Sequence, residues 1–147
     1  RDDKPLIIIG DTGSKYGKML KKNFDDPQIQ FAGGVFDQEA LNQLRYFCKL
    51  YFHGHSAGGT NPSLLEAMAS SALICAHDNM FNRSVLRKSA FYFKYPEDIV
   101  AIIEDEKLVE RYRKVFPDEN LKRIRDFYNW PDVIDSYYQL FEKLLLA

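Results

Sequence analysis

Short apolar runs alternate along the chain with segments in which apolar residues recur every three or four positions. Apolar runs rich in β-branched and aromatic side chains are typical of buried strands. They predict strands at residues 6–10, 29–32, 50–53, 73–76 and 91–93. The helical spacing predicts helices at residues 14–24, 38–48 and 62–70, and a helical segment from Pro96 to the end with breaks near Pro117 and Pro131.

The order of these elements favours one fold class. Strands that alternate with helices of this length are typical of parallel βαβ units. We therefore expect an α/β fold, with a Rossmann-like doubly wound parallel sheet and a helical C-terminal segment, and we assign residues 1–147 to a single domain. Ligands of such sheets bind beyond the carboxyl ends of the strands. Three segments occupy that position: "GDTGSKYGK" at 10–18, "GGVFD" at 33–37 and "GHSAGGTNP" at 54–62.

Composition and charge narrow the function classes. A net charge of −1 over 147 residues argues against a protein dedicated to nucleic-acid binding, which would carry a basic excess. The sequence has no apolar run of about 18 residues, so it predicts no transmembrane segment. Cys48 and Cys75 lie in apolar surroundings and are expected to be reduced thiols. We therefore expect a cytoplasmic protein, either free or peripheral to the inner face of the membrane.

The segment at 10–18 does not match a nucleotide-binding loop of the P-loop type. Counting back from Gly17 and Lys18, the first glycine of that motif should stand where the sequence has Thr12, and Met19 replaces the required serine or threonine. No G-x-G-x-x-G sequence occurs at any strand–helix junction either. These two absences disfavour kinase-like and dehydrogenase-like chemistry.

The third segment is more specific, because it predicts the start of a helix. Asn61 suits the N-cap and Pro62 the first helical position. Backbone N–H groups at such a start attract anions. Glu66 then has two interpretations: it closes a capping box with Ser63, or its carboxylate accepts hydrogen bonds from ribose hydroxyls. The second interpretation predicts a nucleotide whose diphosphate binds at the loop.

The run from His53 to Leu86 resembles the carboxy-terminal, donor-binding half of family 4 glycosyltransferases of the GT-B fold. It is most similar to the rhamnosyltransferase-like branch of bacterial surface-polysaccharide synthesis. In that family a Glu-x7-Glu motif holds the nucleotide sugar. Glu66 matches the second glutamate, whereas Gly58 stands at the first, so backbone N–H groups are left to hold the donor there. The donor-binding residues we predict are Glu66, Gly58, Gly59, Thr60, Asn61, Pro62, Ser63, His55, Val35 and Phe36.

The resemblance implies a retaining, metal-independent glycosyltransferase that transfers a sugar from a nucleoside diphosphate sugar to a polysaccharide or lipid-linked acceptor. Family members enter this half with a further strand carrying an arginine and a lysine, and they have an N-terminal acceptor-binding domain. Both are expected to be missing here, so the chain is interpreted as a fragment without catalytic residues of its own. A nucleotide-sugar epimerase of GT-B architecture and a non-catalytic nucleotide-binding or interaction module are the alternatives.

Two further expectations concern residues near the predicted site and at the C-terminus. His53 and His55 lie two apart at a strand end, and we expect their side chains to point to opposite sides. Without a clustered carboxylate or thiolate they are an incomplete ligand set, so we predict no metal and no cofactor. Near the C-terminus, an apolar helix face is expected to belong to the core or to cover the missing half; its residues are Tyr137, Tyr138, Phe141, Leu144 and Leu145.

Overall fold

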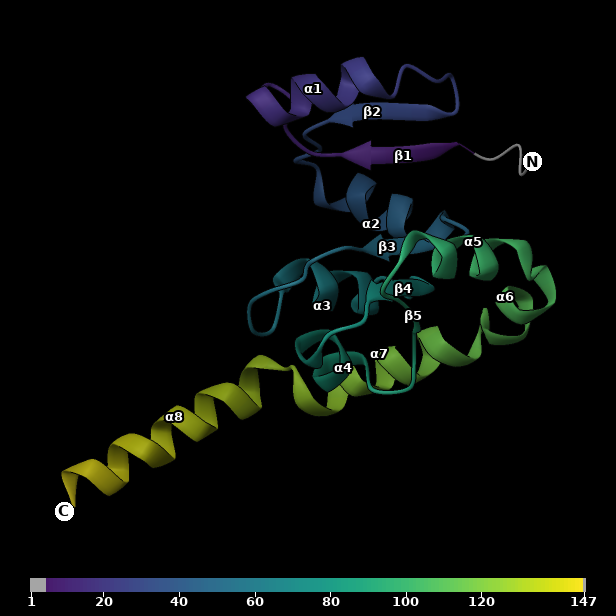
Figure 1. Ribbon diagram of the computed structural model, residues 1–147. Helices are drawn as coiled ribbons and strands as arrows, with labels where there is room; N and C mark the ends of the chain where they lie inside the picture. The colour runs from purple at the N-terminus through teal and green to yellow at the C-terminus, as the bar shows by residue number, and fades with distance from the viewer. Residues whose placement is uncertain (1–4, 147) are drawn as a thin grey trace. The chain divides into compact units, whose positions relative to one another are not determined.

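The computed structural model describes residues 5–146, and the chain forms two compact units, Arg1–Leu41 and Asn42–Ala147. The first unit is a single β-α-β unit (Figure 1). Its two strands pair in parallel, as strands joined by a helix do. The elements are β1 (Leu6–Ile9), α1 (Lys15–Asn23) and β2 (Ile29–Gly33), followed by the start of α2 (Gln38–Phe47), which ends in the second unit.

Helix α1 is fixed at its start by local chemistry. The Ser14 hydroxyl oxygen accepts a hydrogen bond from the backbone N–H of Gly17 at 3.0 Å, as an N-cap does. Gly17 is buried, and a β-carbon there would lie 2.6 Å from the α-carbon of Thr12. Only glycine therefore fits at this position without a backbone shift.

The second unit contains a three-stranded parallel sheet with the strand order β3-β4-β5 (Figure 1). Helices follow each strand. The elements after α2 are β3 (Tyr51–His53), α3 (Pro62–Ala69), β4 (Ile74–His77), α4 (Met80–Leu86), β5 (Phe91–Phe93), α5 (Pro96–Glu104), α6 (Glu106–Tyr112), α7 (Val115–Phe127) and α8 (Trp130–Leu145).

The core of the second unit consists of two buried clusters, and residues in and next to β4 contribute side chains to both. Ile74 and Ala76 belong to a buried cluster with residues of α3 and α4. Leu73 and Cys75 point the other way and belong to a second cluster with residues of β5, α6 and α7. Alternate residues of a strand face opposite sides of a sheet, so this sheet is covered by helices on both faces. That arrangement is typical of Rossmann-like folds.

The predicted α/β class with parallel strands and a helical C-terminal segment is confirmed, and each predicted strand is found within one or two residues of its expected bounds. The strands differ from the prediction in forming two sheets, β1-β2 and β3-β4-β5, rather than one. Helix α4 was not predicted, and Asp105, which caps α6, divides the helical segment at a further point. No helix within residues 5–146 is long and apolar enough to cross a membrane.

Candidate functional site

The loop between β3 and α3 ends in a defined helix cap. Oδ1 of Asn61 accepts a hydrogen bond from the backbone N–H of Ser63 at 3.0 Å and one from the Ser63 hydroxyl at 2.7 Å. Pro62 is the first residue of α3. The prediction that Asn61 is the N-cap is confirmed, and the capping box of Ser63 with Glu66 is wrong because Ser63 lies inside the helix. Both hydrogen-bond donors of Ser63 are engaged by the cap.

The residues just before the cap keep their backbone donors free. Gly59 and Thr60 are exposed, and the backbone N–H groups of Gly59, Thr60 and Asn61 donate to no acceptor within the part of the chain that the structure describes. A β-carbon at Gly59 would meet no atom within 4 Å. The loop therefore presents three unused N–H groups at the start of a helix, where an anion is favoured.

Gly58 adopts a backbone conformation that favours glycine. Its φ is +106°, a value that side chains of L-residues rarely permit. A glutamate at this position would be strained in the observed loop. The observed loop therefore favours glycine at this position.

Glu66 lies in the second turn of α3 and is joined to α2. Its Oε2 accepts a hydrogen bond from Nη2 of Arg45 at 2.6 Å, and the two groups form an ion pair. The Arg45 side chain is buried, whereas the Glu66 side chain keeps 43% of its exposure. Glu66 thus has a partner that the sequence analysis missed. Arg45 lies on the buried face of α2. A single arginine among the inward-facing positions of the predicted helix is the feature of the sequence that could have indicated a buried ion pair.

Two histidines at the end of β3 and just beyond it, His53 and His55, lie on the same side. The rings of His53 and His55 are stacked with centroids 4.6 Å apart. Our expectation that they point to opposite sides is wrong, because residues two apart along a strand share a face. His53 is 1% exposed and its Nε2 has no hydrogen-bond partner within the described residues. Burial, and to a lesser degree the neighbouring His55, lowers the pKa of His53 to about 4, so its ring is neutral at pH 7.

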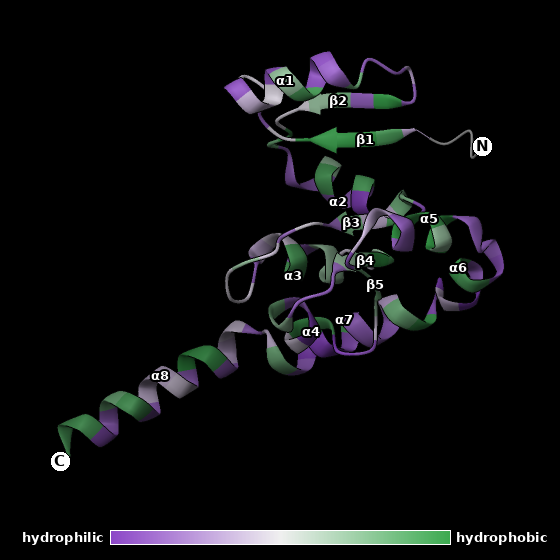
Figure 2. Ribbon diagram, in the orientation of Figure 1, coloured by the Kyte–Doolittle hydropathy of each residue, from purple (hydrophilic) through white to green (hydrophobic). Residues whose placement is uncertain are grey.

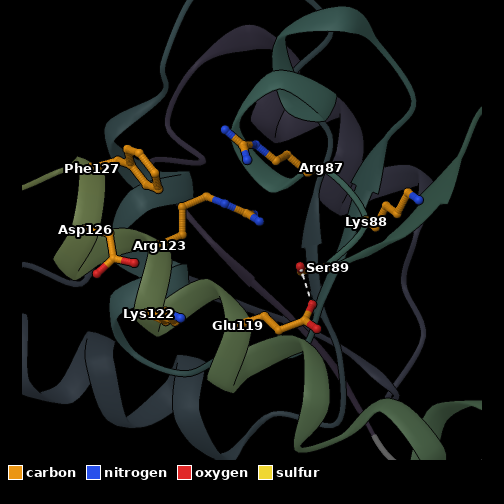
Figure 3. A pocket seen from close by; sticks show the side chains of 8 residues that line it. All are labelled: Arg87, Lys88, Ser89, Glu119, Lys122, Arg123, Asp126 and Phe127. Carbon is orange, nitrogen blue, oxygen red and sulfur yellow. Dashed lines mark hydrogen bonds between the residues drawn. The ribbon is translucent and has the colours of Figure 1, made fainter.

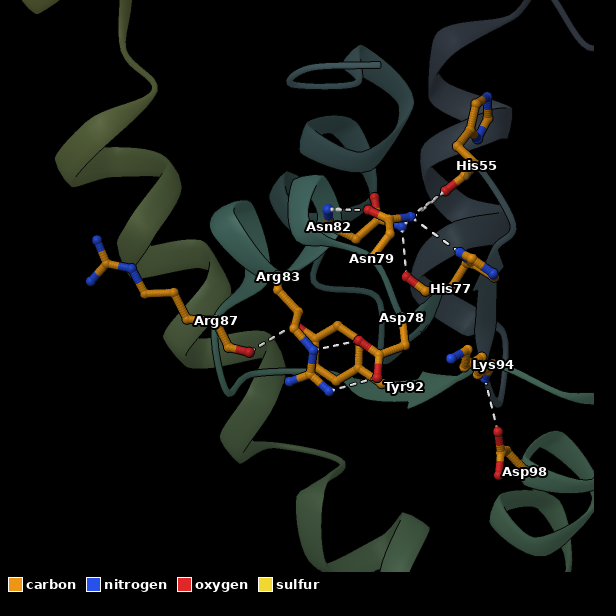
Figure 4. A network of polar contacts seen from close by, with 10 residues as sticks. All are labelled: His55, His77, Asp78, Asn79, Asn82, Arg83, Arg87, Tyr92, Lys94 and Asp98. Carbon is orange, nitrogen blue, oxygen red and sulfur yellow. Dashed lines mark hydrogen bonds and ion pairs between the residues drawn. The ribbon is translucent and has the colours of Figure 1, made fainter. Parts of the chain in front are cut away.

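Two asparagines tie the loop after β3 to the end of β4 (Figure 4). Nδ2 of Asn79 donates to the backbone oxygen of His55 at 2.9 Å, and Nδ2 of Asn82 donates to the same oxygen at 3.1 Å. Asn82 also donates to the backbone oxygen of His77 at 2.9 Å. Asn79 caps α4 as well. Neither role was predicted from the sequence, because α4 itself was not predicted.

A salt bridge closes the other side of this polar network. Arg83 donates from Nη2 to Oδ2 of Asp78 at 2.9 Å and from Nε to Oδ1 (Figure 4). The hydrogen bond from Arg83 holds the pKa of Asp78 below its ordinary value. The Arg83 guanidinium also lies over the ring of Tyr92, 4.3 Å from its centroid. Asp78 and Arg83 are thus engaged with each other.

Two of the predicted donor-binding residues belong to the first unit. Val35 and Phe36 follow β2, and Phe36 is 97% exposed. Gly34 lies under this ring, where a β-carbon would be 3.0 Å from Cε2 of Phe36. The other predicted residues, from His55 to Ser63 together with Glu66, lie on one continuous segment of the second unit. The donor-binding role of both groups stays a prediction.

A hollow in the second unit contains none of the predicted residues (Figure 3). It lies beside the turn that precedes β5, at the amino end of that strand, whereas the loop at 54–61 follows the carboxyl end of β3. Within residues 5–146 no group of three histidines, cysteines or carboxylates is arranged to hold a metal ion. The residues that line the hollow are Arg87, Lys88, Ser89, Glu119, Lys122, Arg123, Asp126 and Phe127.

Comparison with known proteins gives a distant similarity. The chain is 25% identical over 160 residues to an uncharacterized glycosyltransferase, MJ1069, of Methanocaldococcus jannaschii. The similarity covers 95% of this chain and 37% of that protein, so the chain spans little more than a third of its relative. No family model matches the chain. These findings support a relationship to glycosyltransferases in general rather than to one branch of them.

Proposed function

We propose that this chain is the donor-binding part of a glycosyltransferase and that it holds a nucleoside diphosphate sugar at the start of α3. The observation that carries the proposal is the set of three unused backbone N–H groups at Gly59, Thr60 and Asn61, next to the Asn61 cap. The distant similarity to a glycosyltransferase supports the same reaction class.

The chemistry assigned to the loop is electrostatic. A diphosphate held by backbone N–H groups at a helix N-terminus is stabilised by fixed dipoles. Negative charge grows on this group as the sugar leaves, so donors placed there lower the barrier. Glu66 follows one turn later, and its carboxylate is the acceptor for the ribose hydroxyls. His55 lies within the loop. The resemblance to family 4 assigns Val35 and Phe36, in the first unit, to the nucleobase.

The finer assignment rests on the resemblance of the run from His53 to Leu86 to family 4 of the GT-B glycosyltransferases. This resemblance implies that the sugar is transferred with retention of configuration and without a metal ion. It also implies the rhamnosyltransferase-like branch of bacterial polysaccharide synthesis and a polysaccharide or lipid-linked acceptor. Cys48 and Cys75 are both free thiols, in keeping with a cytoplasmic location.

An acceptor-binding domain is the proposed partner within a longer protein. Strand β1 has exposed apolar side chains, among them Leu6 and Ile7. Helix α8 buries no side chain, although its apolar residues include Phe141 and Leu144. Figure 2 shows hydrophobic and hydrophilic residues in turn along this helix. Exposed apolar surfaces of this kind mark contact sites. The relative, of which this chain spans 37%, is long enough to include such a domain.

The loop is tested by blocking the approach of a ligand while leaving the fold unchanged. Gly59→Val places a side chain in open space in the free protein, because no atom lies within 4 Å of a β-carbon there. Gly54→Val is the matched control, since Gly54 is equally open and lies outside the predicted donor-binding residues. Titration calorimetry with the diphosphates of uridine, guanosine, adenosine, cytidine and thymidine, and with their sugar conjugates, measures binding.

We expect wild type and Gly54→Val to bind one of these diphosphates and Gly59→Val to bind about 100-fold more weakly, because close backbone approach is lost. Equal binding by both variants would show that the loop is not the phosphate site. Absence of binding by wild type would favour an interaction module instead. With any acceptor we expect no release of diphosphate by this chain alone, because acceptor and donor must be held together for transfer.

A further inference from the structure

We propose that Arg45 is a positioning residue, which holds the Glu66 carboxylate in the orientation that binds the donor. The inference rests on the proposed function of Glu66 as the acceptor for ribose hydroxyls. It adds a residue from α2, a helix outside the loop and α3, to the machinery of that site.

The guanidinium of Arg45 is held from two sides. Nη2 donates to Oε2 of Glu66 at 2.6 Å, and Nη1 donates to Oδ1 of Asn42 at 3.3 Å. Oδ1 of Asn42 also accepts a hydrogen bond from the hydroxyl of Ser70, the C-cap residue of α3, at 3.1 Å. The contacts therefore join α2 to both the middle and the end of α3. A group fixed in this way can in turn fix the carboxylate that it contacts.

Because Arg45 is charged and buried, it needs its ion pair with Glu66. Its side chain is only 7% exposed, and its Nε has no hydrogen-bond partner within the residues that the structure describes. A buried cation is strongly unfavourable unless a counterion neutralises it. Glu66 supplies that negative charge. The carboxylate of Glu66 therefore faces Arg45 in the free protein.

The second oxygen of Glu66 is left for a ligand. Oε2 is engaged by Arg45, whereas Oε1 accepts no hydrogen bond from any other side chain or backbone group in residues 5–146. The side chain as a whole is 43% exposed. An ionised acceptor that is already oriented binds a hydroxyl more tightly, because less side-chain freedom is lost on binding. Arg45 therefore acts on the ligand through Glu66 and does not need to touch it.

The same geometry shows why Glu66→Gln alone is an ambiguous test. That substitution removes the acceptor for the ribose and, at the same time, the counterion of buried Arg45. A loss of binding could then follow from a displaced α2 rather than from the missing carboxylate. A double-mutant cycle separates the two effects.

The experiment measures the dissociation constant of the diphosphate that wild type binds for Arg45→Met, Glu66→Gln and the Arg45→Met/Glu66→Gln double variant. Arg45→Lys is included because it keeps the charge but loses the forked geometry. Urea unfolding of every variant reports its stability separately. The double variant removes both charges, so it leaves no unpaired ion from this pair in the protein interior.

We expect Arg45→Met to weaken binding about ten-fold when Glu66 is present and less than about two-fold in the Glu66→Gln background, since Arg45 acts only through the carboxylate. Arg45→Lys should recover part of the loss. Equal losses in both backgrounds, or no loss in either, would overturn the inference while leaving the proposed function intact. If Arg45→Met fails to fold, Arg45→Lys and the Arg45→Lys/Glu66→Gln double variant complete the same cycle. No diphosphate binding by wild type would overturn the proposed function and this inference with it.

Discussion

Strands β1 and β4 are both short and mostly apolar, but their surroundings are very different. Each has four residues in a parallel sheet, all apolar in β1 and apolar except for the final histidine in β4. Strand β4 pairs with β3 and β5 and is covered by helices on both faces, so Ile74 is 0% exposed. Strand β1 pairs, within the described residues, with β2 only, and Ile7 is 43% exposed. Hydropathy therefore identifies a strand, whereas its burial depends on which other elements are present to cover it.

The largest expected difference between the two strands is their tolerance of truncation. Ile74→Ala should lower the free energy of unfolding by about 2–5 kcal/mol, because it leaves a cavity in a closed core. Ile7→Ala should cost less than about 1 kcal/mol, since a half-exposed side chain loses little burial. Urea unfolding followed by circular dichroism measures both, with hydrogen exchange of peptides from each unit to assign the change. A cost at Ile7 as large as that at Ile74 would show that β1 is covered in solution.

The tightest position of the first unit is a glycine rather than a strand residue. Gly17→Ala should lower the free energy of unfolding by about 1–3 kcal/mol, since its β-carbon would collide with the backbone of Thr12. Gly54→Ala is the control, because a β-carbon at Gly54 meets nothing within 4 Å. Hydrogen exchange of residues 5–41 reports the local loss. Equal protection in the two variants would mean that the segment around Thr12 can move aside.

The sequence predicted the strands, most helices and the Asn61 cap, because each of these depends on residues that are close in the chain. Asn61, Pro62 and the strand at 74–77 are examples in which local pattern and structure agree. The division into two sheets was not predicted, because pairing between strands depends on distant partners. Helix α4 was missed because its seven residues, Met80–Leu86, are too few for a clear helical period.

In the candidate site, too, local features were predicted from the sequence and contacts between distant residues were not. The loop glycines and the helix start were predicted from the sequence, since their chemistry is local. The contact of Arg45 with Glu66 joins residues 21 positions apart, and the hydrogen bonds of Asn79 and Asn82 to the His55 backbone oxygen join residues 24 and 27 apart. No short pattern encodes such pairs. They become visible only when α2, α3 and α4 are in place.

The buried His53, on the strand beside β4, makes the stability of the second unit depend on pH. Its pKa is lowered from 6.5 to about 4, so the unfolded chain binds the proton more readily between these values. The contribution of neutral His53 to stability is complete above about pH 6.5 and is lost as the pH falls toward 4, with about 2 kcal/mol lost between pH 7 and pH 5. His53→Phe should remove this slope.

Urea unfolding at pH 7, 6 and 5 measures the slope for wild type and His53→Phe. Only the slopes are compared, because the substitution can also change the stability at pH 7. Parallel slopes for the two proteins would contradict the assignment and would mean that water reaches the His53 ring.

Helix α8 is even less buried than β1. It is amphipathic and buries no side chain, and Phe141 and Leu144 are exposed. The double variant Phe141→Gln/Leu144→Gln keeps good helix formers at both positions and should change the free energy of unfolding by no more than about 0.5 kcal/mol, as exposed substitutions do. Leu64→Ala, in the buried cluster next to β4, is the contrast and should cost about 2–5 kcal/mol. Circular dichroism checks that α8 stays helical. A cost above about 1 kcal/mol for the double variant would show that the apolar face packs within this chain, and the proposed contact of α8 with an acceptor-binding domain would then be wrong.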